Sequence, residues 1–162
     1  MEEIMENRFA EVILKLEEGY RQHPYKCTLG FNTIGYGRVL SPDKNDPLPN
    51  IVANEKEELE FLRKRIKQHI ADIQRAKPLA WSKCNEQRQA ILISLCYQLG
   101  FNGALAFKKM WAAIEMGNFE EASKQMLDSL WAKQTPKRAS RHAKTMKDGS
   151  LDMYYISNGV FQ

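Results

Sequence analysis

The segment EEGYRQHPYKCTLGFNTIGYG, residues 17–37, constrains the fold of this chain more than any other stretch. An amphipathic run ends at Glu18, and Gly19 follows where helices commonly end in the left-handed conformation. Residues 30–32 offer a turn, and the β-formers of residues 33–36 follow it. The segment therefore predicts the end of a helix followed by a tight β-hairpin.

Three side chains of this segment are candidates for joint chemistry: Glu18, Cys27 and Thr33. A carboxylate at a helix C-terminus faces the negative end of the helix dipole, which favours its protonated form, as a general acid requires. The thiol could act as nucleophile or base, and the hydroxyl could hold a water. A solvated Glu, a buried Cys and a strand-forming Thr are the commoner interpretation, and these rules do not separate Glu17 from Glu18.

The spacing of these residues resembles a known signature. Glu, eight residues, Cys, five residues and Thr lie in the pattern EG-x-R-x-x-x-Y-x-C-T-x-G-x-x-TIG-x-G. This pattern is similar to the active-site signature of the T-even type phage lysozymes, glycoside hydrolase family 24, in which the middle position is Asp or Cys. Residues 88–110 resemble the buried central helix of that family and the helix after it, and residues 130–141 resemble its W-x-x-Q-T-P-x-R-x-x-R run.

The resemblance implies an α+β, mostly helical, lysozyme-like fold of one domain with two lobes. A small β-containing lobe would occupy about residues 19–53, and a connecting helix about residues 54–75. The larger helical lobe would take residues 76–162 together with the first helix, residues 3–18.

Periodicity and capping residues give a compatible helix map. Apolar residues recur at helical spacing in residues 3–18 and 54–75, the latter starting at an Asn54–Glu57 capping pattern. A nearly all-apolar helix is expected to follow Asn85 and to end at Gly100. His69, on the long helix, is expected to be a surface or packing residue rather than a ligand.

The C-terminal third predicts further helices. Asn118 and Glu121 form a second capping pattern, from which the core is expected to continue through Met126 and Leu130. Thr135, followed by a proline, is expected to cap the last helix. That helix is basic, and a charged face of this kind is usually solvated. The basic residues are Lys137, Arg138, Arg141, Lys144 and Lys147. The tail of residues 150–162 is apolar enough to pack back.

The resemblance also implies an activity, hydrolysis of the β-1,4 bond between N-acetylmuramic acid and N-acetylglucosamine in peptidoglycan. It makes Glu18 the general acid, puts Cys27 in place of the second acidic residue and gives Thr33 the role of positioning water. Arg138 matches an arginine near the catalytic Glu. The remaining implied substrate-binding residues are Val39, Tyr97, Met110 and Gln125.

The sequence departs from the family pattern at Arg38, where the family often has His. The sequence leaves open whether Cys27 attacks directly or completes a water site, and inversion is favoured by analogy.

Charge, cysteine content and the N-terminal residues indicate which partners, cofactors and cellular location to expect. A formal net charge of +4 favours an anionic partner without choosing between wall polymer and nucleic acid. Three cysteines without a C-x-x-C pattern indicate neither a disulfide framework nor a metal site, and no cofactor is expected. The acidic N-terminus lacks signal-peptide features, and no apolar run reaches transmembrane length. We expect a monomer made in the host cytoplasm, released to the wall through a separate holin, with no nucleic-acid partner and no membrane insertion.

Other functions remain open from the sequence. A lytic transglycosylase needs an acid/base Glu but no positioned water, so Cys27 and Thr33 argue against it. A secreted or tail-delivered antibacterial effector could use the same chemistry. A non-catalytic wall- or nucleic-acid-binding protein could use the basic helix, although no helix-turn-helix, RRM or zinc-finger signature supports a nucleic-acid module.

Overall fold

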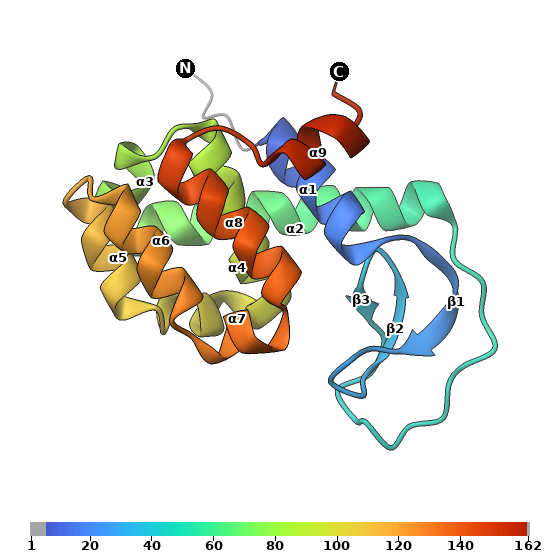
Figure 1. Ribbon diagram of the computed structural model, residues 1–162. Helices are drawn as coiled ribbons and strands as arrows, with labels where there is room; N and C mark the ends of the chain where they lie inside the picture. Colours follow the sequence, from blue (N-terminus) through green and yellow to red (C-terminus); the bar gives the residue numbers. More distant parts are fainter. Residues whose placement is uncertain (1–5, 162) are drawn as a thin grey trace.

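The computed structural model describes residues 6–161 and has an α+β fold, mostly helical, with one small antiparallel sheet (Figure 1). The predicted fold class is confirmed. The elements, in chain order, are α1 (Arg8–Glu18), β1 (Arg21–Lys26), β2 (Asn32–Gly35), β3 (Arg38–Val39), α2 (Glu55–Ala76), α3 (Pro78–Lys83), α4 (Glu86–Leu105), α5 (Lys108–Glu115), α6 (Phe119–Leu127), α7 (Leu130–Gln134), α8 (Pro136–Asp148) and α9 (Met153–Asn158).

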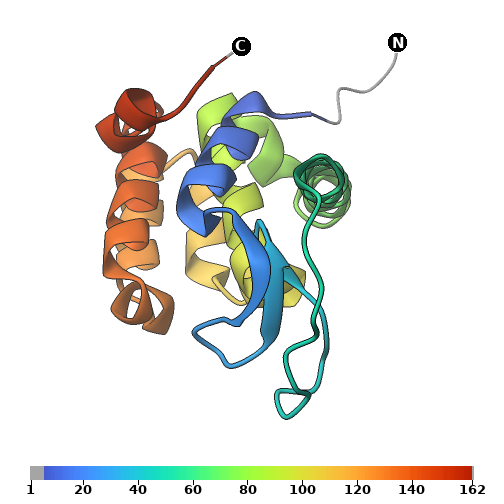
Figure 2. The same ribbon diagram turned by 90° about the vertical axis from the view of Figure 1, so that its right-hand side faces the viewer.

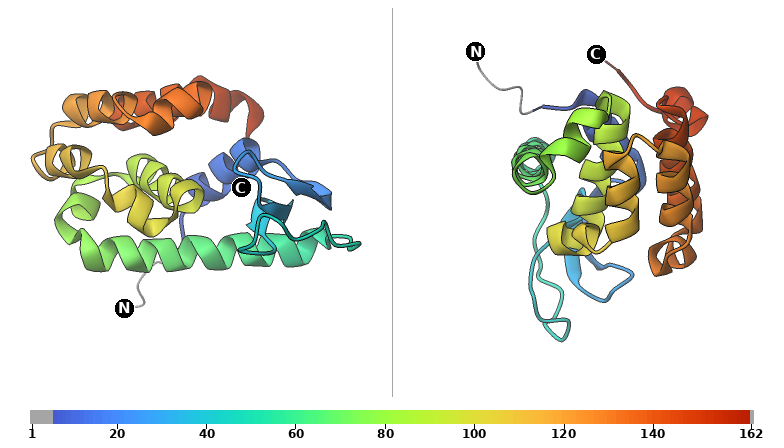
Figure 3. Two further views of the ribbon diagram at one scale, coloured as in Figure 1. Left: turned by 90° about the horizontal axis from the view of Figure 1, so that it is seen from below. Right: turned by 90° about the vertical axis from the view of Figure 1, so that its left-hand side faces the viewer.

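The long helix α2 runs along the molecule, with the sheet beside its N-terminal half and most other helices beside its C-terminal half (Figures 1 and 3). Helix α1 lies between α2 and α8 and leads directly into the sheet (Figure 2). The last residue of α1 therefore faces both the sheet and the helices. A functional side chain at this point can be reached from both parts of the fold.

The sheet has the order β1-β2-β3, and both pairs are antiparallel. Tyr25 pairs with Thr33, and Thr33 in turn pairs with Val39. The β1–β2 register is irregular between Arg21 and Tyr25, where Pro24 cannot donate a ladder hydrogen bond. The turn closes at Gly30, whose φ of 91° suits a residue without a Cβ. The predicted hairpin is present.

Helix α1 begins later than the sequence analysis expected. Residues 3–5 lie outside the described residues, and Glu6 and Asn7 are not helical. Asn7 is the N-cap, because its side-chain oxygen accepts a hydrogen bond from the N–H of Ala10 at 3.0 Å. The predicted start followed the acidic residues and overlooked this stronger capping residue. At the other end Gly19 has a positive φ of 67°, but its ψ of 172° is outside the left-handed helical region.

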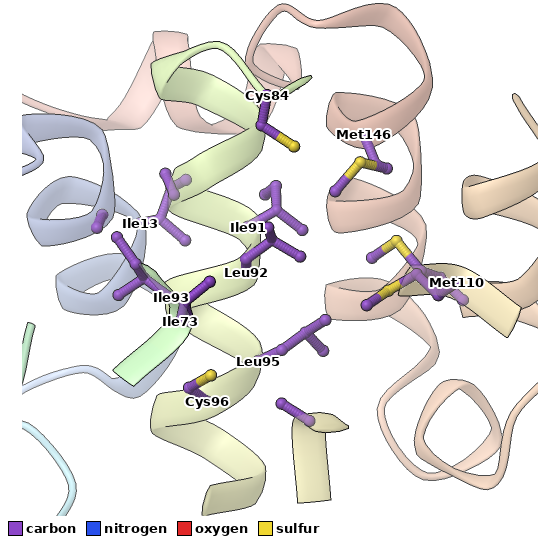
Figure 4. Close-up of a cluster of buried hydrophobic side chains, with 14 of the residues drawn as sticks. Ile13, Ile73, Cys84, Ile91, Leu92, Ile93, Leu95, Cys96, Met110 and Met146 are labelled. Carbon is purple, nitrogen blue, oxygen red and sulfur yellow. The ribbon is translucent and has the colours of Figure 1, made fainter. Parts of the chain in front are cut away.

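The buried centre of the helical part is α4, as its sequence predicts (Figure 4). Ile91, Leu92, Ile93, Leu95 and Cys96 are buried there, and they meet side chains from surrounding helices. Asn85 caps α4 by accepting a hydrogen bond from the N–H of Arg88. The helix is interrupted at Gly100.

Two expectations for the C-terminal third are wrong. Leu130 does not continue the core after α6, because the chain turns and Leu130 starts α7 with its side chain 69% exposed. Thr135 makes no side-chain cap to α8; its hydroxyl donates instead to the carbonyl of Trp131 at 3.0 Å. A short helix ending at Thr135 gives that hydroxyl a nearer acceptor. The tail does pack back, with Tyr155 of α9 fully buried.

His69 is a packing residue, as expected. It is 2% exposed on α2 and lies edge-on to Tyr97, with ring centroids 6.4 Å apart. Neither of its ring nitrogens has a hydrogen-bond partner among the described residues. Burial lowers the pKa of His69 to about 4.

Among the described residues, no single helix is long and apolar enough to cross a membrane; α4 and α5 would meet that test only together, and they are bent by 96°.

Candidate active site

Glu18 is the last residue of α1, and its two carboxylate oxygens face different partners. Oε1 accepts a hydrogen bond from Nη1 of Arg138 on α8 at 2.9 Å. Oε2 points at the turn between β2 and β3, because a Cβ placed on Gly37 would come within 2.9 Å of it. The side chain of Glu18 is 19% exposed, so solvent reaches it only partly. One oxygen is thus fixed by an arginine while the other faces a glycine backbone.

The neighbouring Glu17 lies in a closed polar cluster with side chains of α8 and α9. Arg141 of α8 donates to both of its oxygens, at 2.7 and 3.3 Å, and the hydroxyl of Tyr155 donates to Oε2 at 2.6 Å. Its side chain is only 4% exposed. Every oxygen of Glu17 is therefore occupied by the protein itself, which leaves none for a substrate.

Cys27 and Thr33 come together at the closed end of the hairpin. The Cys27 side chain is half-buried, and Thr33 is 2% exposed. Burial alone would raise the pKa of the Cys27 thiol, but hydrogen bonds from the N–H groups of residues 29–31, helped by the nearby Thr33 side chain, outweigh it. The net result is a pKa below the ordinary value for cysteine, which increases the thiolate fraction at neutral pH. The Thr33 hydroxyl donates its proton to the carbonyl of Phe31, at 2.8 Å.

Tyr25 lies near both parts of this site. The charges of Glu18 and Cys27 each act on its hydroxyl, and they raise the pKa of Tyr25 together with burial, which is the larger cause. Tyr25 pairs with Thr33 across the hairpin. It is therefore the residue whose charge environment connects the end of α1 with the hairpin, and the joint action of Glu18, Cys27 and Thr33 stays a prediction.

The glycine turn beside Glu18 is held against α2. Arg38 donates three hydrogen bonds to the carboxylate of Glu58, which is 3% exposed, and the shortest is 2.7 Å. A Cβ on Gly35 would lie 2.5 Å from that carboxylate, so the backbone packs directly on it. The hydroxyl of Tyr36 donates to Glu55 at 3.0 Å. Arg38, which departs from the usual His, thus serves as an anchor between the sheet and α2.

The four other expected substrate-binding residues are spread over both parts of the fold. Val39 is 53% exposed on β3. Tyr97 is partly buried on α4, where its hydroxyl donates to the carbonyl of Tyr36. Met110 and Gln125 lie on the wall of a pocket of about 410 Å³ between α5, α6 and α7. Other residues of this pocket are Phe107, Lys108, Asp128 and Trp131.

The basic helix α8 has two kinds of charge. Arg138 is buried and Arg141 is mostly buried, and both pair with carboxylates of α1. The lysines of the same helix are exposed, as expected for a solvated face. Sequence reasoning assigned Arg138 to the site only by resemblance, and it gave no role to Glu17, Ser94, His142 or Tyr155. Arg138 and Arg141 lie three residues apart, and this i,i+3 spacing places them as neighbours on one face of a helix, which is the signal that could have joined Arg141 to Arg138.

Among the described residues, no group of three or more His, Cys, Asp or Glu side chains is arranged to hold a metal ion. The chemistry available at the site is that of a carboxyl group, a thiol and a hydroxyl beside an arginine. These groups suit acid-assisted cleavage of a bond with help from water or a nucleophile.

The chain belongs to the phage lysozyme family, whose family model matches residues 15–144. Two proteins of Dictyostelium discoideum named as probable T4-type lysozymes 1 and 2 are each 28% identical, over 88% of this chain and 95% of their own length. The pre-baseplate central spike protein Gp5 of Enterobacteria phage T4 is 31% identical over 89% of this chain, which corresponds to 28% of the spike protein.

Family membership makes this protein a lysozyme, a glycoside hydrolase. The matched range includes Glu18, Cys27, Thr33 and Arg138.

Proposed function

We propose that this protein is a muramidase that hydrolyses the β-1,4 bond between N-acetylmuramic acid and N-acetylglucosamine in peptidoglycan, with Glu18 as the general acid. The observation that carries the proposal is the asymmetry of the Glu18 carboxylate. Arg138 holds Oε1, and Oε2 is directed at the Gly37 turn, which follows the strand β2 that carries Thr33. Oε2 is the oxygen from which a proton can pass to a sugar.

In this mechanism protonated Glu18 donates its proton to the oxygen of the leaving sugar. The developing positive charge on the other sugar is met by a water held by Thr33 and Cys27 on the hairpin. Once Glu18 has lost its proton, Arg138 stabilises the resulting carboxylate through the hydrogen bond to Oε1. A water between an acid and a second group on the opposite face gives inversion at the anomeric carbon.

Direct attack by Cys27 is the alternative route at the same site. The lowered pKa of its thiol provides some thiolate at neutral pH. Attack would give a covalent glycosyl–enzyme intermediate and retention of configuration. Proton NMR of the anomeric product during the first minutes of the reaction separates the two routes, because only inversion gives the opposite anomer first.

The test of the proposal uses isolated sacculi with the wild type and with Glu18→Gln, and mass spectrometry of the released fragments. We expect the wild type to release fragments with free reducing muramic ends and Glu18→Gln to release none while remaining folded. Anhydromuramyl ends would identify a lytic transglycosylase instead. Normal digestion by Glu18→Gln would overturn the assignment of the acid.

Lysis of the host from within is the setting that we propose for this activity: synthesis in the host cytoplasm and passage to the wall through a holin. Expression with and without a holin tests it, since lysis should require both proteins. The match to a phage spike protein favours a second candidate, an enzyme delivered from outside. Mass spectrometry of purified phage particles separates the two candidates, because a delivered enzyme would be part of the particle and an enzyme released through a holin would not.

A further inference from the structure

A chain of buried hydrogen bonds connects the two carboxylates of α1 through the helical part of the fold. From Arg138 it passes to the hydroxyl of Ser94 on α4 at 2.9 Å, and from there to Nε2 of His142 on α8 at 2.7 Å. Nδ1 of His142 is 2.9 Å from the hydroxyl of Tyr155, which reaches Glu17 at 2.6 Å. Ser94, His142 and Tyr155 are completely buried. None of the three has a role in the mechanism given above.

The Glu17 end of the chain fixes the direction of the hydrogen bonds. Glu17 is a carboxylate paired with Arg141, so it can only accept. The hydroxyl of Tyr155 must therefore give its single proton to Glu17. Its oxygen then accepts from His142, which requires a proton on Nδ1.

The Arg138 end leads independently to the same arrangement. A guanidinium can only donate, so Ser94 accepts from Arg138. The structure gives the hydroxyl proton of Ser94 no acceptor among the described residues other than Nε2 of His142. Nε2 is therefore unprotonated. Both ends of the chain require a neutral imidazole with its proton on Nδ1.

The environment of the ring supports a neutral form. Burial, together with the charges of Arg138 and Arg141, lowers the pKa of His142 well below its ordinary value. Nδ1 is also 4.0 Å from Glu17, so an N–H at that position faces a negative charge. A second proton on Nε2 would place a positive ring between two arginines and would remove the acceptor for Ser94.

We propose that His142, as the neutral Nδ1–H imidazole, is a positioning residue that holds Arg138 against Glu18 by way of Ser94. The inference rests on the proposed role of Glu18 as the acid. The positioning role is also supported by the guanidinium of Arg138, whose buried Nε has no hydrogen-bond partner among the described residues. Nη1 of Arg138 donates to Glu18, and one hydrogen bond alone would let the guanidinium plane rotate. The second hydrogen bond, from Nη2 to Ser94, therefore fixes the orientation of that plane.

Nitrogen NMR of the histidine-labelled full chain tests the proton arrangement directly. At pH 7 we expect His142 to show one protonated nitrogen, Nδ1, and one unprotonated nitrogen, Nε2, with an Nδ1–H proton that exchanges slowly. A ring protonated on Nε2, or on both nitrogens, would overturn the inference. This measurement does not depend on activity.

Matched serine variants test the positioning role. Ser94→Ala removes the link from His142 to Arg138, and Ser123→Ala removes another buried serine hydroxyl, which donates to the carbonyl of Ala143 on α8. For Ser94→Ala we expect kcat to fall about tenfold with KM changed by less than twofold. For Ser123→Ala we expect kcat within twofold of the wild type. Equal kcat for the two variants, both folded, would overturn the positioning role.

A pair of histidine variants separates the two ring nitrogens. The amide of Gln reaches the position of Nε2 and can accept from Ser94, whereas the shorter Asn reaches only the position of Nδ1. We expect His142→Gln to keep at least threefold more kcat than His142→Asn at a temperature where both are folded. The reverse order would contradict the role assigned to Nε2.

The outcomes also separate this inference from the proposed function. A wild type that leaves sacculi intact, although His142 shows the Nδ1–H pattern, would overturn the proposed function and with it the positioning role. An active wild type with an unchanged Ser94→Ala variant would overturn the positioning role alone.

Discussion

Two consecutive glutamates at the end of α1 have opposite surroundings. Glu17 is 4% exposed, and its oxygens are taken by Arg141 and Tyr155. Glu18 is 19% exposed, is held by Arg138 through one oxygen and leaves the other toward the Gly37 turn. The same residue type, one position apart, thus serves two purposes: Glu17 ties three helices together, and Glu18 keeps an oxygen available for chemistry.

Neighbouring positions at the end of a helix acquire different roles from what packs against each face. Residues one apart on a helix point about 100° away from each other. In this protein one direction leads into the helical core and the other leads to the hairpin.

Alkylation of Cys27 should reduce activity without disturbing the hydrogen bonds around Glu17. The thiol has a lowered pKa and is half-buried, whereas burial raises the pKa of Cys84 and of Cys96 to about 12. At pH 7.5 iodoacetamide should label Cys27 only and reduce kcat by more than about 100-fold, since the added group fills the space where water or sugar must bind. Peptide mass spectrometry and a thermal melt check the result. Labelled protein with full activity would show that Cys27 lies outside the reaction.

Glu17→Gln should reduce stability much more than it reduces activity. Removing one partner of a buried ion pair is strongly destabilising, and we expect about 2 kcal/mol because Arg141 is 21% exposed and can gain some hydration. The matched control is Glu11→Gln on the same helix, which breaks surface pairs with Lys15 and Arg63 and should lower the free energy of unfolding by less than about 0.5 kcal/mol. Urea unfolding measures both, and equal losses would contradict the distinction.

Gly37→Ala should lower activity where Gly19→Ala does not. Both glycines have a positive φ, so each substitution strains the backbone, by about 1–3 kcal/mol at Gly19, whose ψ of 172° lies in a region that is essentially confined to glycine. Only at Gly37 would the new Cβ crowd Oε2 of Glu18, at 2.9 Å; at Gly19 it would meet nothing within 4 Å. We expect kcat to fall about tenfold for Gly37→Ala relative to Gly19→Ala. Similar kcat values for the two would mean that Oε2 does not face the turn in the active protein.

The smallest effect is expected for tyrosine hydroxyls. Tyr97→Phe removes the hydrogen bond to the carbonyl of Tyr36, which supports the turn beside Glu18. A single neutral hydrogen bond contributes about 1 kcal/mol, so kcat/KM should fall by at most about fivefold. Tyr154→Phe, on the Glu17 side, keeps the ring that lies over Arg141 and should leave kcat/KM unchanged. A larger loss from Tyr154→Phe than from Tyr97→Phe would contradict the different roles assigned to Glu17 and Glu18.

The local patterns of the sequence were enough to predict much of the fold. The hairpin follows from glycines and β-formers, and the helix starts at Asn54, Asn85 and Asn118 follow from side-chain caps that the structure contains. Leu130 was misplaced because a short helix with a change of direction has no distinct periodicity. Thr135 was misassigned because its hydroxyl found an acceptor on the preceding helix, which a linear pattern does not reveal.

The candidate site was predicted less completely than the fold, because several of its contacts join segments that only tertiary packing brings together. Glu18, Cys27 and Thr33 are close in sequence, so the local pattern of a helix end and a hairpin is enough to predict that they lie near one another. Ser94 on α4 lies 48 residues before His142 on α8, and only packing brings them, together with Tyr155 on α9, into one row of hydrogen bonds. Glu17 and Glu18 could not be distinguished because the dipole acts on both, and the arginines that separate them lie more than a hundred residues away.

The most direct test of the central claim compares Glu17→Gln and Glu18→Gln side by side. Hydrolysis of sacculi is measured at a temperature where circular dichroism shows both variants to be folded. We expect Glu18→Gln to lose more than about 1,000-fold in kcat and Glu17→Gln to stay within about tenfold of the wild type. An inactive Glu17→Gln beside an active Glu18→Gln would contradict this expectation and would exchange the roles of the two residues.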